Sequence, residues 1–137
     1  MSKTLAIIKP DAVEKNAAGA IIEKIQSAGF KILGLRMLKI DRSQAGVFYE
    51  VHKERPFYND LCDYMSGGKI IPIALEKDNA VDDFRKVIGN TDPEQAEVGT
   101  IRKLFGTSKA VNAIHGSDSD ENAAKEIVFF FNASELV

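Results

Sequence analysis

The stretch that decides the fold is TLAIIKPDAV, Thr4–Val13. Its first part, as far as Lys9, is a short run of aliphatic and β-branched residues, which predicts a buried strand. Pro10 ends this run and disfavours helical backbone at the residue before it, so Lys9 is expected at the end of the strand. Pro10 and Asp11 suit the first turn of a helix, where a missing N–H costs nothing and an acidic side chain is favourable. We therefore expect a buried strand followed directly by a short helix.

A second helix and a second strand come next. Apolar residues recur at helical spacing from Ala18 to Ala28, and Gly29 suits the C-cap of such a helix. The run FKILGLRMLKI, Phe30–Ile40, predicts a strand. Its alternating residues are Leu33, Leu35 and Met37 on one side and Gly34 and Arg36 on the other.

The middle of the chain predicts helices on either side of a third strand. Residues 43–68, SQAGVFYEVHKERPFYNDLCDYMSGG, predict short helices broken at Pro56 and ended by a pair of glycines. KIIPIALEK, Lys69–Lys77, predicts a strand. Pro72 within it favours an edge position or a bulge, because proline cannot donate to a strand ladder. Apolar residues at helical spacing from Ala80 to Ile88 predict an amphipathic helix.

The last part of the chain combines a long loop with one more strand and helix. Gly89 ends the preceding helix, and residues 90–110 are mostly polar, which predicts a long and functional loop. Val111–Ile114 predicts a short last strand. Residues 118–131, DSDENAAKEIVFFF, predict a final helix, and Ser117–Asp120 matches the S-x-x-D capping-box pattern.

This order of elements fits two layouts. One is a ferredoxin-like βαββαβ sandwich of the α+β kind, a four-stranded antiparallel sheet with helices on its faces. The other is a small doubly wound parallel sheet. The length of 137 residues and the absence of a linker predict a single domain over residues 1–137.

Composition excludes several classes of function. A net charge of −2 provides no extended basic face for nucleic acid or an anionic membrane. The single cysteine, Cys62, cannot form an internal disulfide, which fits a reducing compartment. The apolar run before Lys9 is too short for a signal peptide or a membrane span, so we expect a cytoplasmic protein without membrane partners.

Several common motifs are absent. The sequence contains neither G-x-x-x-x-G-K-[ST] nor G-x-G-x-x-G, so no glycine loop of these kinds holds phosphates. It contains no H-x-x-x-H or C-x-x-C pair that would indicate zinc, and no G-x-S-x-G nucleophile elbow. No protein metal site is therefore predicted.

His115 is the first candidate for chemistry. A neutral imidazole can attack phosphorus with one nitrogen if a partner on the other nitrogen fixes its tautomer and direction. Glu126 on the following helix could be that partner, with Ser117 bridging them. Gly116 leaves room for a tetrahedral group beside the ring. The alternative is an exposed turn histidine next to a helix cap.

Lys9, Arg85 and Arg102 are the second candidate group. They come from three segments, and phosphoryl transfer needs positive groups aimed at the transferring oxygens. The alternative is three separate solvated charges.

Three aromatic residues flank HKERP, namely Tyr49, Phe57 and Tyr58. An exposed aromatic ring here could stack on any nucleobase, since every base has a π face. The alternative is core packing between helices.

Taken together, five segments resemble the nucleoside diphosphate kinase family. TLAIIKPDAV, FYEVHKERPFYNDL, VIGNTDP, GTIR and NAIHGSDS match the family signatures in order, over about Thr4 to Phe131. The resemblance implies the ferredoxin-like fold. It also implies transfer of the γ-phosphate from a nucleoside triphosphate to a nucleoside diphosphate, by a ping-pong route with Mg²⁺ held mainly by the nucleotide phosphates. Broad tolerance of base and sugar would follow from a base held only by stacking.

The resemblance also implies roles for individual residues. His115 would be phosphorylated, with Glu126 holding its ring and Ser117 hydrogen-bonded nearby. Phe57 would stack on the base. Lys9 and Asn112 would contact the ribose, with Lys9 also near the transferring phosphate. The remaining predicted residues are Arg85, Thr91 and Arg102 on phosphate oxygens and Tyr49 in the phosphoryl site.

Three positions depart from the family pattern. Val98 replaces a usual proline, Leu104 an acidic residue and Val111 a basic one. In the family these positions shape the loop and subunit contacts, and the resemblance implies a homotetramer or homohexamer built from dimers. A nucleotide-binding module without turnover is the main alternative function, and nucleic-acid binding is a weaker one.

Overall fold

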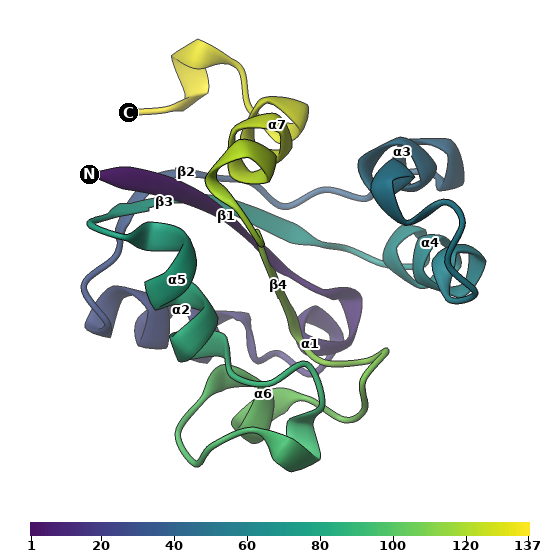
Figure 1. Cartoon of the computed structure of the whole chain (residues 1–137), viewed down its shortest axis with the longest axis horizontal. Coiled ribbons are helices and arrows are strands. Elements are labelled where there is room, and N and C mark those ends of the chain that lie inside the picture. Colours follow the sequence, from purple (N-terminus) through teal and green to yellow (C-terminus); the bar gives the residue numbers. More distant parts are fainter.

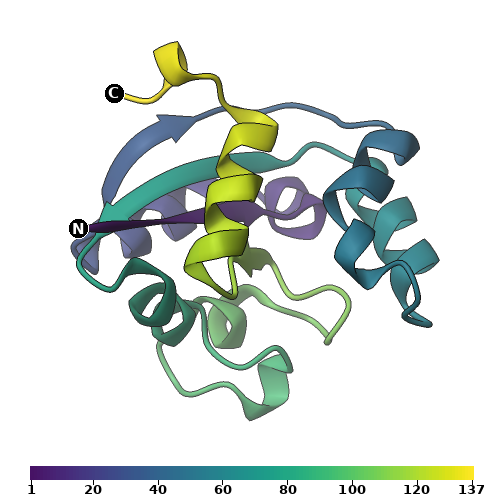
Figure 2. The same cartoon turned by 45° about the horizontal axis from the view of Figure 1, so that its top comes forward.

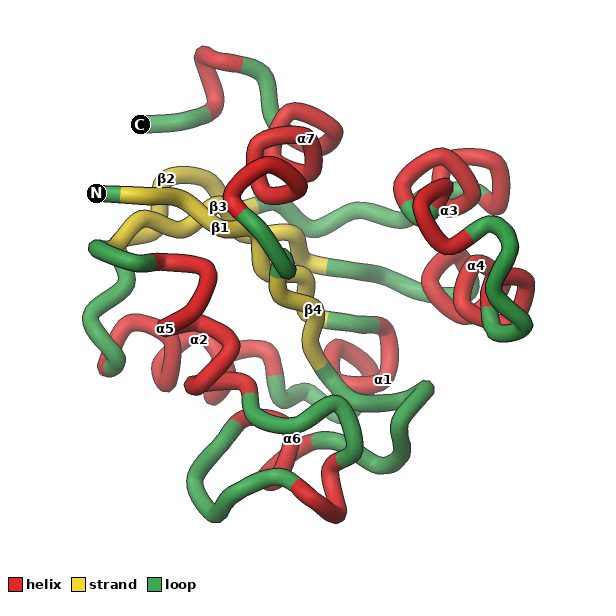
Figure 3. The backbone as a smooth tube through the Cα atoms, in the orientation of Figure 1, coloured by secondary structure: helices red, strands yellow, loops and turns green.

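The four strands form one antiparallel sheet in the order β2-β3-β1-β4. The computed structural model describes all 137 residues. The strands are β1 (Ser2–Ile8), β2 (Lys31–Leu35), β3 (Ile71–Lys77) and β4 (Ile114–Gly116) (Figure 3). Because every neighbouring pair is antiparallel, the ferredoxin-like layout is confirmed and the doubly wound parallel layout is wrong.

Helices cover both faces of the sheet. They are α1 (Pro10–Glu14), α2 (Ala18–Ser27), α3 (Arg42–Phe48), α4 (Tyr58–Ser66), α5 (Ala80–Ile88), α6 (Ile101–Phe105) and α7 (Asp120–Phe130). Short 3₁₀ turns lie at Glu50–His52, Pro93–Gln95 and Ala133–Glu135. In Figure 1, α2 and α5 lie on one side of the sheet and α7 on the other, while α3 and α4 form a hairpin beyond its end; Figure 2 shows the same arrangement turned. No helix combines the length and apolar character needed to cross a membrane.

The two covered faces explain why β1 is apolar at consecutive positions. Ile8 belongs to a buried cluster with the helices α2 and α5, and Ile7 belongs to a second cluster with α7. Every residue from Leu5 to Ile8 is fully buried. A strand buried on both faces shows a continuous apolar run rather than alternation, as the sequence of β1 predicts.

β2 is shorter than predicted, and its apolar residues do not share one buried face. The register with β3 shifts between Ile32 and Gly34, and the strand ends at Leu35. Leu33 is buried, but Leu35 is 46% and Met37 is 54% exposed. A bulge inserts an extra residue and reverses the faces after it. The prediction that Leu33, Leu35 and Met37 share one side of the strand is therefore wrong after the bulge.

Pro72 does not mark an edge strand, because β3 lies between β1 and β2. The backbone N–H of Arg36 donates to Pro72 O at 3.2 Å, just beyond the end of β2. Proline cannot donate in return, whereas Leu38 and Ile70 exchange both backbone bonds further along. The proline is tolerated in a central strand because it removes one bond opposite Arg36 while pairing continues at Leu38 and Ile70.

Three boundaries near the C-terminus differ from prediction. β4 begins at Ile114 rather than at Val111, which makes His115 a strand residue and not a turn residue. The loop at residues 90–110 contains α6 and a 3₁₀ turn. The N-cap of α7 is Ser119, whose hydroxyl accepts from Asn122 N at 3.1 Å, and not Ser117.

Candidate active site

His115 faces Glu126 across the gap between β4 and α7. Its neighbours Ile114 and Gly116 contact the α5 side of the sheet, so alternation along the strand turns His115 towards α7. His115 Nε2 lies 2.8 Å from Glu126 Oε1, and both side chains are 18% exposed. A carboxylate only accepts, so Nε2 carries the proton and Nδ1 keeps its lone pair. The ring is therefore oriented with a free nucleophilic nitrogen.

Ser117 connects this pair to the centre of the sheet. It is fully buried, and its hydroxyl donates to Glu126 Oε1 at 2.8 Å. The same hydroxyl accepts from Leu5 N at 3.1 Å on β1. Ser117 therefore fixes the carboxylate against a central strand, and the predicted grouping of these three residues is present in the geometry.

Two aromatic residues at the end of α3 enclose the ring of His115. Phe48 and Tyr49 meet it edge-on, with ring centroids 5.7 and 6.4 Å away. Burial raises the pKa of Tyr49, and the charge of Glu126 raises it further. The buried hydroxyl of Tyr49 has no hydrogen-bond partner, so a neutral donor close to His115 is left unpaired in the structure.

Lys9 and Asn112 form a second unit beside the site. Lys9 Nζ donates to Asn112 Oδ1 at 2.8 Å, and Asn112 Nδ2 donates to Thr91 O at 3.1 Å and Lys109 O at 3.0 Å. The pKa of Lys9 is lowered to about 8, first by burial and then by the charge of Arg102, while the charge of Asp11 opposes the shift. The sequence placed Lys9 at the end of β1, and it directly follows that strand.

Arg102 is held by backbone carbonyls. Its Nη1 donates to Gly89 O at 3.1 Å and its Nη2 to Ile114 O at 2.8 Å, while Nε has no partner. Burial lowers its pKa to about 10, and the charge of Arg85 contributes. A buried cation with an unused donor is suited to binding an anion. The bond to Ile114 O holds Arg102 beside Ile114, the residue before His115.

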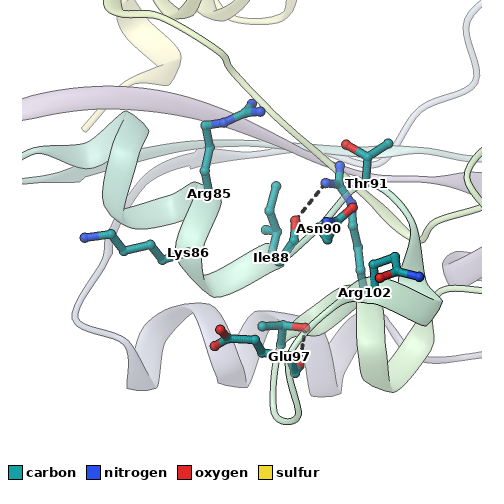
Figure 4. A pocket seen from close by; sticks show the side chains of 10 residues that line it. Arg85, Lys86, Ile88, Asn90, Thr91, Glu97 and Arg102 are labelled. Carbon is teal, nitrogen blue, oxygen red and sulfur yellow. Dashed lines mark hydrogen bonds between the residues drawn. The ribbon is translucent and has the colours of Figure 1, made fainter.

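A polar cavity of about 520 Å³ lies between α5 and the loop that follows it. The three residues predicted to bind phosphate, Arg85, Thr91 and Arg102, line it together (Figure 4). Lys86 adds a third cation, against the single carboxylate of Glu97. His115 does not line the cavity, and Arg102 connects the two places through its bond to Ile114 O.

Phe57 lies apart from the other predicted residues. Its side chain is 49% exposed, and its ring is tilted against His52 at 5.5 Å. His52 in turn stacks on Tyr49 at 6.4 Å. The structure therefore links Phe57 to His115 through the rings of His52 and Tyr49. Tyr58 does not join this group, and its hydroxyl donates to Gly46 O instead.

Some contacts were not predicted. Phe48 was missed because its helical spacing does not distinguish packing on the core from packing on His115. Asp11 accepts from Ala113 N at 3.2 Å, and no pattern within either segment indicates that pairing. Gly116 has a packing role, since a Cβ there would meet Phe84 and Ile88 at 3.0 Å. The room that its missing side chain leaves is therefore filled by α5, and not left open beside His115 as expected.

Comparisons with known proteins relate the chain to one family. The profile of a family described as nucleoside diphosphate kinase matches residues 2–136. Proteins named nucleoside diphosphate kinase from Chloroherpeton thalassium and Chlorobaculum tepidum are 57% and 55% identical over 137 residues, covering all of this chain and 97% and 98% of theirs.

Solved structures of the same kind superpose closely. The nucleoside diphosphate kinase of Aquifex aeolicus gives a TM-score of 0.98 at 45% identity over 99% of both chains. That of Halobacterium salinarum, in complex with CDP, gives 0.94 at 32% identity over 99% of this chain and 91% of its own.

Proposed function

The chain belongs to the nucleoside diphosphate kinase family, enzymes that transfer the γ-phosphate from a nucleoside triphosphate to a nucleoside diphosphate through a phosphohistidine, and we propose that His115 carries the phosphate here. The observation that supports this assignment best is the bond from His115 Nε2 to Glu126 Oε1 at 2.8 Å, which leaves Nδ1 free. The family activity and this oriented ring support the same reaction.

The proposed transfer has two half-reactions. The Nδ1 lone pair attacks the γ-phosphorus, the bond from that phosphorus to the β,γ-bridging oxygen breaks, and the diphosphate leaves with both bond electrons. The Nε2 proton stays on the ring, where the charge of Glu126 stabilises the cationic imidazole. A β-phosphate oxygen of the second diphosphate then attacks the phosphorus, and the electron pair of the P–N bond returns to Nδ1.

The cations would bind the polyphosphate. Arg85, Thr91 and Arg102 line one polar cavity, which supports phosphate contacts from all three. Arg102 Nε and the Tyr49 hydroxyl are buried donors without a partner, and a phosphate oxygen bound next to them would supply one. Positive groups aimed at these oxygens favour the transition state, in which negative charge spreads over them.

The nucleoside would lie across Phe57, Lys9 and Asn112. The exposed ring of Phe57 offers a stacking surface that every base can use, and Lys9 with Asn112 offers polar groups to the ribose. CDP in the complex of the Halobacterium salinarum relative is a nucleoside diphosphate, which supports this class of substrate. Broad tolerance of base and sugar is part of the proposal.

Mg²⁺ is proposed as the cofactor, bound mainly to nucleotide phosphates and water, as is usual for this ion in nucleotide enzymes. The structure assembles no group of three or more histidine, cysteine or acidic side chains that could hold a metal ion. The ion would neutralise phosphate charge, and Arg85 and Arg102 would do the same from the protein side.

We also propose one domain over residues 1–137 and a homo-oligomer, either a tetramer or a hexamer of dimers. Leu35 and Met37 are exposed at the free edge of the sheet, and apolar groups beside an unpaired strand favour association. A mass measurement in solution tests the oligomer.

The buried thiol of Cys62 is compatible with the proposed cytoplasmic location. Val98 and Leu104 are exposed on the loop, away from the contacts of His115.

Incubation with γ-labelled ATP tests the function. The wild type should acquire an acid-labile label and pass it to a second nucleoside diphosphate. His115→Ala should acquire none, while His52→Ala, which removes the other histidine, should still be labelled. Label that persists in His115→Ala would overturn the residue assignment. Nucleotide-dependent stabilisation without any label would instead support a binding module without turnover.

A further inference from the structure

A strained turn lies two residues before His115. Ala113 has a φ of +74°, and Ile114 N donates to Asn112 O at 2.9 Å across it. A bond between residues two apart around a positive φ defines a γ-turn of the rare and strained kind. Alanine disfavours this backbone, so the turn persists only where its surroundings hold it.

One short segment holds the turn from both sides. Lys9 N donates to Ala113 O at 2.8 Å, and Ala113 N donates to Asp11 Oδ2 at 3.2 Å. Both peptide groups of the buried alanine are thus bound by residues directly after β1. The other oxygen of Asp11 accepts from the hydroxyl of Tyr64 on α4, and Asp11 N donates to the same hydroxyl at 3.3 Å.

We infer that Asp11, held in place by Tyr64, is a positioning residue for phosphoryl transfer, and this rests on the proposed role of His115. The turn it holds carries Asn112, the partner of Lys9 Nζ, on one side and His115 on the other. A relaxed turn would change the distance between the ribose contacts and the nucleophile. Asp11 acts on the reaction only through Ala113 and touches neither substrate nor phosphate.

The first experiment separates the hydrogen bond from the charge of Asp11. Asp11→Ala should slow single-turnover phosphorylation of His115 by roughly 10- to 100-fold, as misplacement of reacting groups does. Asp11→Asn should stay close to wild type, because its amide oxygen can accept from Ala113 N while its NH₂ donates to Tyr64. Asp60→Ala, at an exposed aspartate in the first turn of α4, is the matched control and should not change the rate.

If Asp11→Asn is as slow as Asp11→Ala, the charge that Asp11 exerts on Lys9 is what matters, and the inference is overturned. Tyr64→Phe should give a smaller loss, since Asp11 keeps its bond to Ala113 but loses its support. If Asp11→Ala does not fold, Tyr64→Phe takes its place in the comparison with Asp11→Asn.

The second experiment is a rescue. Glycine adopts positive φ freely, so Ala113→Gly should need less support from Asp11. The double variant Asp11→Ala/Ala113→Gly should recover most of the rate of Ala113→Gly alone, which a general packing role for Asp11 does not predict. Absence of recovery overturns the inference.

Amide hydrogen exchange in nucleotide-free protein tests, independently of the reaction, whether Asp11 holds the turn at Ala113. This hold of Asp11 on the turn is called the clamp below. The Ala113 N–H should exchange faster in Asp11→Ala and remain protected in Asp11→Asn. If wild type is not labelled on His115 but this pattern holds, the proposed function fails while the clamp remains. Unchanged exchange in Asp11→Ala overturns the clamp.

Discussion

A single oxygen of Glu126 accepts from both His115 and Ser117, each at 2.8 Å. The carboxylate thereby orients the imidazole while being oriented itself by a hydroxyl that is bonded to β1. Its negative charge lies where positive charge develops on the ring during attack on phosphorus. The orientation and the electrostatic effect come from the same atom, and substitutions can separate them.

Glu126→Gln should keep the shape of this group and remove its charge. Charge-assisted hydrogen bonds contribute about 1.5–3 kcal/mol, so phosphorylation of His115 should slow by roughly 10- to 150-fold. Rapid-quench kinetics would measure this rate, and nucleotide affinity should hardly change because Glu126 is not proposed to contact the nucleotide. A variant with weak nucleotide binding and a normal rate would contradict this account.

Ser117→Ala should reduce both stability and activity. It leaves the buried Leu5 N without its partner, which costs about 1–3 kcal/mol in the free energy of unfolding, and it releases Glu126. Ser119→Ala is the matched control. It removes the N-cap of α7, costs about 1 kcal/mol, and should leave the transfer rate unaltered. Urea unfolding and steady-state assays distinguish the two serines, and equal activity in both variants would refute the role of Ser117.

Lys9 should produce an alkaline limb in the activity profile. Burial lowers its pKa to about 8, so the free enzyme loses this cation as pH rises through that value. The ratio kcat/KM should therefore fall above about pH 8, and kcat should fall at higher pH because bound phosphate favours the charged form. Lys9→Gln should show no such limb. A wild-type kcat/KM that stays flat to pH 10 would count against the assignment.

The same group predicts a change in stability with pH. The pKa of Lys9 is about 8 in the folded chain and 10.5 as a model value, so the unfolded chain binds this proton more tightly. The free energy of unfolding should therefore rise as pH increases between these values, relative to Lys9→Met, and the difference between the two proteins should be constant below pH 8. Unfolding curves across this range measure it, and a falling difference would show that the sign is wrong.

Gly89→Ala should impair phosphate binding as well as folding. Gly89 has a φ of +89°, and a Cβ there would lie 2.6 Å from Thr100 Oγ1. We expect a loss of about 1–3 kcal/mol in the free energy of unfolding and a raised nucleotide KM, since Gly89 O holds Arg102.

Gly19→Ala is the control for Gly89→Ala, because no atom lies within 4 Å of its added Cβ. It lies in α2 and should raise stability by up to about 1 kcal/mol. A KM that changes equally in both variants would contradict the link between Gly89 and Arg102.

Local patterns in the sequence predict the elements that local forces determine. The buried run of β1, the helix start at Pro10, and α5 with its end at Gly89 follow from residue type and spacing. Features that depend on distant partners were not predictable in this way. The bulge in β2 depends on its pairing with β3, and the late start of β4 depends on the turn at Ala113 that Lys9 and Asp11 hold.

The candidate site shows the same division. A histidine, a carboxylate on the next helix and three cations could be identified from the sequence as a chemically suitable set, and the family resemblance supplied their roles. The capping pattern selected Ser117, but Ser119 caps the helix, because the burial of Ser117 beside Leu5 is a tertiary effect. The contacts of Asp11 with Ala113 and Tyr64 join residues far apart in sequence, which no short-range periodicity reports.

Pro72 has a consequence for where the sheet stops being regular. Its carbonyl accepts from Arg36, but its nitrogen has no proton to donate in return, so this pair exchanges one bond where Leu38 and Ile70 exchange two. The carbonyl of Arg36 must find another partner or water. One ring in a central strand thus weakens the pairing locally, at the point where the chain leaves β2 on its way to α3.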